Sequence, residues 1–265
     1  MKAYDFEYDG INLSDKGFIL CNFGGSKGLE TVNDGCQITF NTAPVLGGSK
    51  HNLISTEYED CLEIPLQICK HSCNGGIQEI TETEHQELTK WLNRKKFLKF
   101  KILDESHIDL YYEAIINISK IEIDGRLFGF ELEVKTNRPF ALKEPRIINI
   151  KNLEQDGKHS FNDISHEEGY IYPIVEITVN ADGNLNIYNA IEDRSTYIAN
   201  CKVNEVITMD YPVIQSSDSS HNIQNDFNWN FFRVANTFEN SRNDLTISLP
   251  CSIKIEYSPI VKVGL

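Results

Sequence analysis

A change in the spacing of apolar residues near Lys95 restricts the first half of the chain to a helix followed by strands. Thr81, followed three residues later by Glu84, gives the pattern of a capping box, in which two side chains satisfy backbone donors at a helix start. The next apolar residues share one helical face: Leu88, Trp91 and Leu92. We therefore predict one short helix over about residues 82–94.

After this helix, apolar and polar residues alternate, which is typical of strands with one buried face. Three segments show the pattern: residues 98–102, 112–118 and 128–134. Asp124-Gly125 lies between the last two segments, and this pair favours a tight hairpin because glycine tolerates positive φ. The sequence therefore predicts an antiparallel sheet in this region.

The residues before the helix predict further strands. Alternation from Tyr4 to Tyr8 ends at Asp9-Gly10 and indicates an opening hairpin. Two more strands are expected at residues 36–40 and 62–68. Pro65 interrupts the second of these and has no backbone donor, so we expect it at a sheet edge or a bulge.

Residues 41–58 form the least core-like part of the first half, with glycines, a proline and scattered apolar groups. A long loop in a compact domain is usually functional or mobile. Two interpretations remain open: a plain surface loop, or an arm that reaches a neighbouring subunit. In the second interpretation the contacts come from the apolar residues Pro44, Leu46, Leu53, Ile54 and Tyr58.

A polar, turn-rich stretch around Pro145 marks the expected domain boundary, giving domains of residues 1–145 and 146–265. The second half predicts short strands and no helix. We expect residues 174–179 and 185–187 to pair as a hairpin around Asp182-Gly183, residues 214–226 to be a loop, and residues 227–234 to be a strand. The fold class is therefore mainly β, with a sandwich or split-barrel-like first domain and a second β-sandwich.

Charge and cysteine content exclude some functions. A net charge of −14 argues against nucleic-acid binding, which depends on Lys and Arg. Without a run of about 18 apolar residues, no membrane insertion is expected. No apolar signal core is visible, so we expect synthesis in a cytosol, where the seven cysteines stay reduced. Cys69, His71 and Cys73 lack the second ligand pair of a structural zinc site, so no metal or other cofactor is expected.

No catalytic motif is present, and we predict that the chain is not an enzyme. The aromatic run at Trp229, Phe231 and Phe232 has two interpretations. At least one of the neighbouring phenylalanines should enter a core, whereas Trp229 could stack on a sugar together with Tyr188 or Tyr197. A carbohydrate-binding β-sandwich is therefore the alternative function.

The order and spacing of these segments resemble those of a known protein family. The start from Tyr4-Asp5-Phe6 to Gly17-Phe18, the helix ending in Trp91-Leu92 and the exit at Asn137-Arg138-Pro139-Phe140 resemble the N-terminal domain of distal tail proteins of long non-contractile-tailed bacteriophages. Tyr172-Pro173 before a strand and the hairpin around Gly183 are similar to the family's galectin-like second domain.

This resemblance implies a structural tail-tip component, without a cofactor, that forms a ring joining the tail tube to the host-adsorption apparatus. It implies further copies of the chain as partners, usually six in this family, together with the tail tube protein, a tip protein and a receptor-binding protein. The expected location is the tail tip of a virion, after synthesis in the bacterial host cytoplasm, and we expect the gene to belong to a prophage.

Overall fold

The computed structural model describes residues 4–23, 35–70, 78–104, 109–237 and 239–263. The chain divides into two compact units. Unit 1 comprises Met1–Leu142 with Lys262–Leu265, and unit 2 comprises Lys143–Val261. Two short strands, β10 (Ala141–Lys143) and β22 (Ile260–Val261), lie where the chain passes from one unit to the other.

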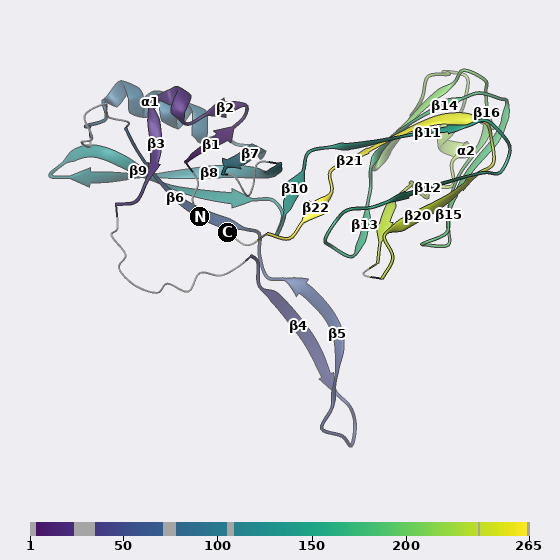
Figure 1. Cartoon of the computed structure of the whole chain (residues 1–265), viewed down its shortest axis with the longest axis horizontal. Helices are drawn as coiled ribbons and strands as arrows, with labels where there is room; N and C mark the ends of the chain where they lie inside the picture. Colours follow the sequence, from purple (N-terminus) through teal and green to yellow (C-terminus); the bar gives the residue numbers. More distant parts are fainter. Residues whose placement is uncertain (1–3, 24–34, 71–77, 105–108, 238, 264–265) are drawn as a thin grey trace. The chain divides into compact units, whose positions relative to one another are not determined.

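Unit 1 is built on an antiparallel sheet with the strand order β2-β1-β7-β8-β9-β6-β3 (Figure 1). The elements are β1 (Asp5–Tyr8), β2 (Ile11–Asn12), the 3-10 turn η1 (Ser14–Lys16), β3 (Phe18–Cys21), β6 (Glu63–Lys70), β7 (Leu98–Leu103), β8 (Leu110–Ile123) and β9 (Arg126–Thr136). Alternate residues of these strands are buried, as the sequence predicts. The predicted mainly β fold class is confirmed.

The predicted turn between β8 and β9 is also present. Asp124 and Gly125 both have positive φ, at 51° and 76°, and Ile123 pairs with Arg126 across the turn. Pro65 pairs with Glu133 of β9, but it lies beyond the end of β3, which pairs only with Gln67–Lys70 of β6. Among the described residues, Pro65 thus has a paired strand on one side only, which agrees with the expected edge position.

The helix α1 (Glu82–Leu92) covers the apolar face of this sheet. The predicted capping box is present, but the helix ends at Leu92 and not at residue 94, because Asn93 leaves helical geometry with ψ at 86°. Trp91 fixes the helix to the sheet: its ring stacks on Phe6 with centroids 5.9 Å apart, and its Nε1 donates to the Tyr8 carbonyl at 3.1 Å.

A two-stranded ribbon, formed by β4 (Ile38–Pro44) and β5 (His51–Tyr58), replaces the predicted long loop (Figure 1). The loop prediction was wrong because the strands are held by cross-strand pairing that residue spacing alone did not indicate. Residues 45–50 form the turn, in which the Val45 amide donates to the Lys50 carbonyl. The ribbon is a sheet of its own and is not part of the main sheet.

Unit 2 contains a five-stranded and a four-stranded antiparallel sheet, with the orders β11-β21-β14-β17-β18 and β12-β20-β15-β16, and a small sheet β13-β19. Their bounds are β11 (Arg146–Asn152), β12 (Gly157–Asn162), β13 (Gly169–Ile171), β14 (Ile174–Val179), β15 (Gly183–Asn189), β16 (Arg194–Cys201), β17 (Val206–Asp210), β18 (Val213–Ser216), β19 (Val234–Asn236), β20 (Arg242–Ile247) and β21 (Cys251–Tyr257). One cluster of buried side chains from both larger sheets forms the sandwich core.

Three details of the predicted second half are wrong. The strands expected to form a hairpin around Gly183 belong to different sheets, because β14 pairs with β17 and β21 while β15 pairs with β16 and β20. A one-turn helix, α2 (Ile223–Asp226), lies within the expected loop. Most of the expected strand at residues 227–234 is irregular, since Trp229 has a φ of 60° and only β19 is extended.

The helix cap gives a prediction about pH. A hydrogen bond from Lys70 and then one from the Thr81 amide lower the pKa of Glu84 below its ordinary value of 4.5. A lowered pKa stabilises the fold above pH 4.5, and this contribution is lost as the pH falls through the folded-state pKa. Glu84→Gln should therefore cost about 0.5–1 kcal/mol at pH 7 and progressively less below pH 4.5.

Urea unfolding followed by Trp91 emission measures this cost, in a Trp229→Phe background that leaves one of the two tryptophans. Glu87→Gln, at an exposed position of the same helix, is the control. A cost for Glu84→Gln that is the same at pH 7 and pH 3 contradicts the assignment.

Candidate interaction surfaces

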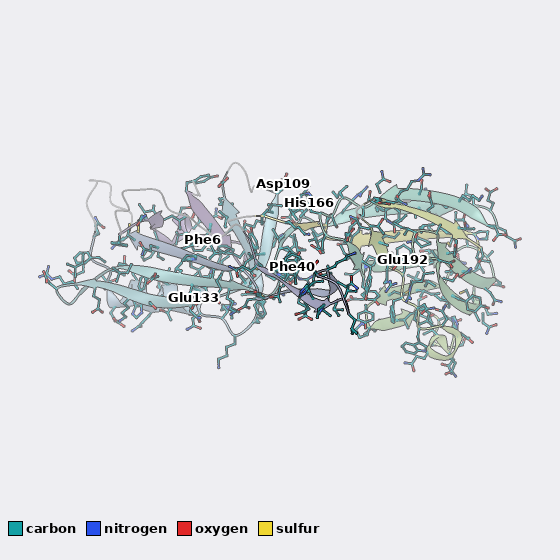
Figure 2. The ribbon with its side chains drawn as sticks, turned by 90° about the horizontal axis from the view of Figure 1, so that it is seen from below. Phe6, Phe40, Asp109, Glu133, His166 and Glu192 are labelled. Atoms are coloured by element: carbon teal, nitrogen blue, oxygen red, sulfur yellow. The ribbon has the colours of Figure 1, made fainter. Side chains whose placement is uncertain are left out.

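The β4–β5 ribbon has one apolar face that is exposed to solvent. Side chains alternate along a strand, so Ile38 and Phe40 share a face with their cross-strand partners Tyr58 and Thr56. Leu53, which pairs with Thr42, continues the same face. Phe40 is 62% exposed and Leu53 is 57% exposed. Figure 2 labels Phe40 on this ribbon. Large apolar groups thus line one side of a thin ribbon.

The opposite face of the ribbon is polar. Thr39 donates to Glu59 at 2.6 Å, and Asn41 donates to Ser55 at 3.0 Å. Such an amphipathic ribbon has the pattern of a surface strand pair whose apolar face packs on something else.

The arm residues predicted from the sequence all lie on this ribbon or its turn. Leu53 and Tyr58 are on the apolar face, and Pro44 ends β4. Ile54 has no cross-strand partner because the register shifts beside it, and Leu46 is fully exposed in the turn. Sequence reasoning missed Ile38 and Phe40, although their alternation on the predicted strand gave a signal.

The second surface is the aromatic loop that precedes β19 in unit 2. Trp229 is 56% exposed, whereas Phe231 and Phe232 are both buried in the core. Asn228 fixes the backbone beside the indole: its Oδ1 accepts from the amides of Tyr197 and Asn230, at 3.2 and 3.1 Å. A bulky residue at positive φ is uncommon, so this loop holds the indole outward at a conformational cost.

Tyr188 and Tyr197 lie half-buried on the outer face of the four-stranded sheet, on the adjacent strands β15 and β16. The Tyr188 hydroxyl donates to Asp193 at 2.9 Å, and this hydrogen bond raises the pKa of the phenol. The backbone of Tyr197 pairs with Asn228, next to Trp229. Tyr188 and Tyr197 are thus neighbours across β15 and β16, whereas the Trp229 ring contacts Phe227 and Phe231.

A longer row of rings runs from the same loop in another direction. Trp229 and Tyr211 both contact Phe231, with centroid distances of 6.4 and 5.3 Å. Tyr211 stacks on Tyr172 at 4.0 Å, and Tyr172 meets Tyr170 edge-on at 5.4 Å. We call Tyr170, Tyr172, Tyr211 and Trp229 the aromatic ridge. The sequence gave no signal for it, because its members come from segments far apart in the chain.

Arg233 borders the ridge. Its guanidinium lies 3.8 Å from the Tyr170 ring centroid and also donates to Glu192 through Nε, at 3.2 Å. Desolvation works to lower the pKa of Arg233, but the hydrogen bond and charge of Glu192 outweigh it and raise the pKa overall. Arg233 therefore stays a cation at the edge of the ridge.

A buried pair of side chains, His221 and Glu205, holds the segment that leads into the aromatic loop. His221 Nδ1 lies 2.6 Å from Glu205 Oε1, and the two side chains are 2% and 0% exposed. Glu205 also accepts from the Ser216 hydroxyl and the Lys202 amide. Ser216 donates to the carboxylate and not to the histidine, so this is not the geometry of an activated nucleophile.

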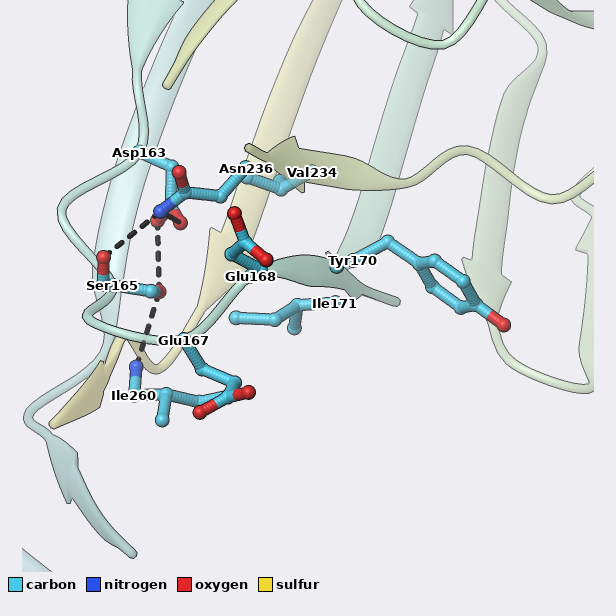
Figure 3. A pocket seen from close by; sticks show the side chains of 10 residues that line it. Asp163, Ser165, Glu167, Glu168, Tyr170, Ile171, Val234, Asn236 and Ile260 are labelled. Atoms are coloured by element: carbon cyan, nitrogen blue, oxygen red, sulfur yellow. Dashed lines mark hydrogen bonds between the residues drawn. The ribbon is translucent and has the colours of Figure 1, made fainter. Parts of the chain in front are cut away.

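A shallow pocket beside β13 has an acidic lining that includes Asp163, Glu167 and Glu168 (Figure 3). Asp163 is occupied by internal hydrogen bonds: Oδ1 accepts from the Ile164 amide and the Ser165 hydroxyl, and Oδ2 accepts from Asn236. These hydrogen bonds tie the segment that follows β12 to Asn236 of β19.

The part of the chain that the structure describes contains no group of three or more His, Cys, Asp or Glu side chains suited to a metal ion. Of the residues considered for zinc, His71 and Cys73 lie outside the described residues. Within the described ranges, none of the helices has the length and apolarity needed to cross a membrane.

Family models of phage tail proteins match nearly the whole chain. A model described as a phage tail protein N-terminal domain matches residues 1–138, and one described as a phage tail C-terminal domain matches residues 140–257. The chain belongs to this family of phage tail proteins. It is therefore a structural component of a phage tail, as the sequence predicted.

The fold of this tail protein is similar to the crystal structure of the Dit protein of SPP1, which is described as a paradigm of the hub adsorption apparatus in phages that infect Gram-positive hosts. The TM-score is 0.62 at 12% identity, over 97% of this chain and 99% of that one. No curated protein matches the sequence. The family match and the shared fold together confirm the resemblance to distal tail proteins.

The buried His221–Glu205 pair gives a prediction about stability. Glu205→Ala leaves the buried Nδ1 of His221 and the Lys202 amide without their carboxylate acceptor, and together these losses cost about 3 kcal/mol or more. Local opening of residues 205–230 should become at least about a hundredfold more frequent. Hydrogen exchange of peptides from this segment measures the change, with the exposed Glu239→Ala as control. Equal exchange in both variants shows that the pair does not hold the loop.

Proposed function

We propose that this tail protein is a distal tail protein whose copies close into a ring, with the β4–β5 ribbon of each subunit packed on its neighbour. The observation that carries the proposal is the exposed apolar face of the ribbon, formed by Ile38, Phe40 and Leu53. An isolated two-stranded ribbon is marginally stable in water. Packing this face on a partner stabilises the ribbon and removes its apolar groups from water.

A second copy of the chain is the partner that a ring requires. A ribbon that packs on a different patch of the next subunit makes a heterologous contact. Such contacts give a closed ring when a whole number of the rotations between neighbouring subunits makes one full turn. The shared fold with SPP1 Dit, whose description places it in a hub, supports this arrangement. We propose a ring of six, as the family resemblance implies.

In this arrangement the ring joins the tail tube protein to a tip protein and a receptor-binding protein at the distal end of the virion tail. The chain is made in the cytoplasm of a bacterial host, from a prophage gene. Its role is structural and not enzymatic, and the hydrogen bond from Ser216 to Glu205, in place of His221, supports this view.

The test compares assembly with and without the apolar face of the ribbon. Sedimentation equilibrium of the full chain should show an oligomer, and electron micrographs should show closed rings. Phe40→Ser with Leu53→Ser should weaken association at least tenfold, because burying each large apolar side chain contributes about 1.5–3 kcal/mol.

The control is Asn41→Ser with Glu57→Gln, which changes the polar face of the same ribbon and should leave association unchanged. A wild-type chain that is monomeric at every concentration contradicts ring formation. An oligomer that persists in Phe40→Ser with Leu53→Ser shows that another surface makes the contact.

A further inference from the structure

We propose that the aromatic ridge of unit 2 binds a neutral saccharide chain, with Tyr211 and Trp229 as the stacking surfaces. This site differs from the group of Trp229, Tyr188 and Tyr197 that the sequence suggested, and it does not depend on ring assembly. The rings of Tyr211 and Trp229 each contact the buried ring of Phe231.

Both rings present apolar surface to solvent. Tyr211 is 53% exposed although one of its faces is stacked on Tyr172 and its edge meets Phe231, so the open surface is mainly the other face. Trp229 is exposed to a similar extent and is in contact with Phe227 and Phe231. A pyranose ring has one face of C–H groups, and such groups are attracted to the negative face of an aromatic ring.

Buried neighbours and backbone hydrogen bonds hold the two rings in position. Phe227 and Phe231 are buried in the sandwich core and support the two exposed rings from below. The loop backbone at Asn228 is fixed to β16, since its Nδ2 donates to the Ser195 carbonyl at 3.0 Å. Preorganised aromatic side chains lose little entropy on binding, so weak stacking contacts can still give measurable affinity.

The edge of the ridge offers hydrogen-bonding groups for sugar hydroxyls. Tyr170 and Tyr172 have phenol groups, and the ion pair of Arg233 with Glu192 lies against Tyr170. Arg233 is already neutralised by Glu192, and the whole chain has a net charge of −14. These charges favour an uncharged hydroxylated ligand over a polyanion such as a poly(glycerol phosphate) chain.

The test is a glycan array followed by calorimetric titration, using the full chain. The probes are neutral hexasaccharides of glucose, N-acetylglucosamine, mannose, galactose and rhamnose, with poly(glycerol phosphate) as the anionic probe. At least one neutral probe should bind saturably. Tyr211→Ala and Trp229→Asn should each weaken that binding about tenfold or more.

Asparagine is chosen at position 229 because it tolerates the positive φ of this residue, so the ring is removed while the backbone is kept. Tyr211→Phe keeps the ring and should retain most of the binding. Tyr4→Ala removes an exposed aromatic residue of unit 1 and is the matched control, and unchanged melting temperatures exclude unfolding.

Each other outcome overturns the proposal. Absence of binding to every neutral probe does so directly. Binding that survives both Tyr211→Ala and Trp229→Asn places the saccharide elsewhere. Binding to poly(glycerol phosphate) alone contradicts the charge argument. A tail protein that binds the ridge while no saccharide does shows that the ridge is a protein-docking surface.

Discussion

The alternation of apolar and polar side chains along each strand is the constraint from which the rest of this structure follows. A strand with one apolar face needs a partner to cover it. Unit 1 covers its sheet with α1, through the Trp91 ring on Phe6. Unit 2 covers one sheet with another, and both contribute to one core. Each unit thereby has a core of its own, although neither has an extensive helical layer.

The same constraint identifies the surfaces that are incomplete in the single chain. The β4–β5 ribbon alternates like the core strands, yet its apolar face meets solvent at Phe40 and Leu53. The aromatic ridge likewise places large rings outside the core, supported by buried ones. A tail component must be stable alone and still offer surfaces to partners. The ribbon is such a surface on unit 1, and the aromatic ridge is one on unit 2.

Much of unit 1 could be predicted because local chemistry determined it. The capping box at Thr81, the Asp124-Gly125 turn and the strand alternation each depend on residues close in sequence. The prediction failed where pairing was not local. The strands on either side of Gly183 look like a hairpin, but they join different sheets because their buried faces are needed on opposite sides of one core.

By itself the sequence determined the fold class, the short helix and the tail-protein family, because each rests on residue type and short-range spacing, and it left residues 41–58 open between a loop and an arm. Only the tertiary structure decided that this segment is an amphipathic ribbon, and that Tyr211 stacks on Tyr172 and, like Trp229, contacts Phe231. Those contacts join residues distant in the chain, and their energy depends on the packing of whole sheets, which no local pattern encodes.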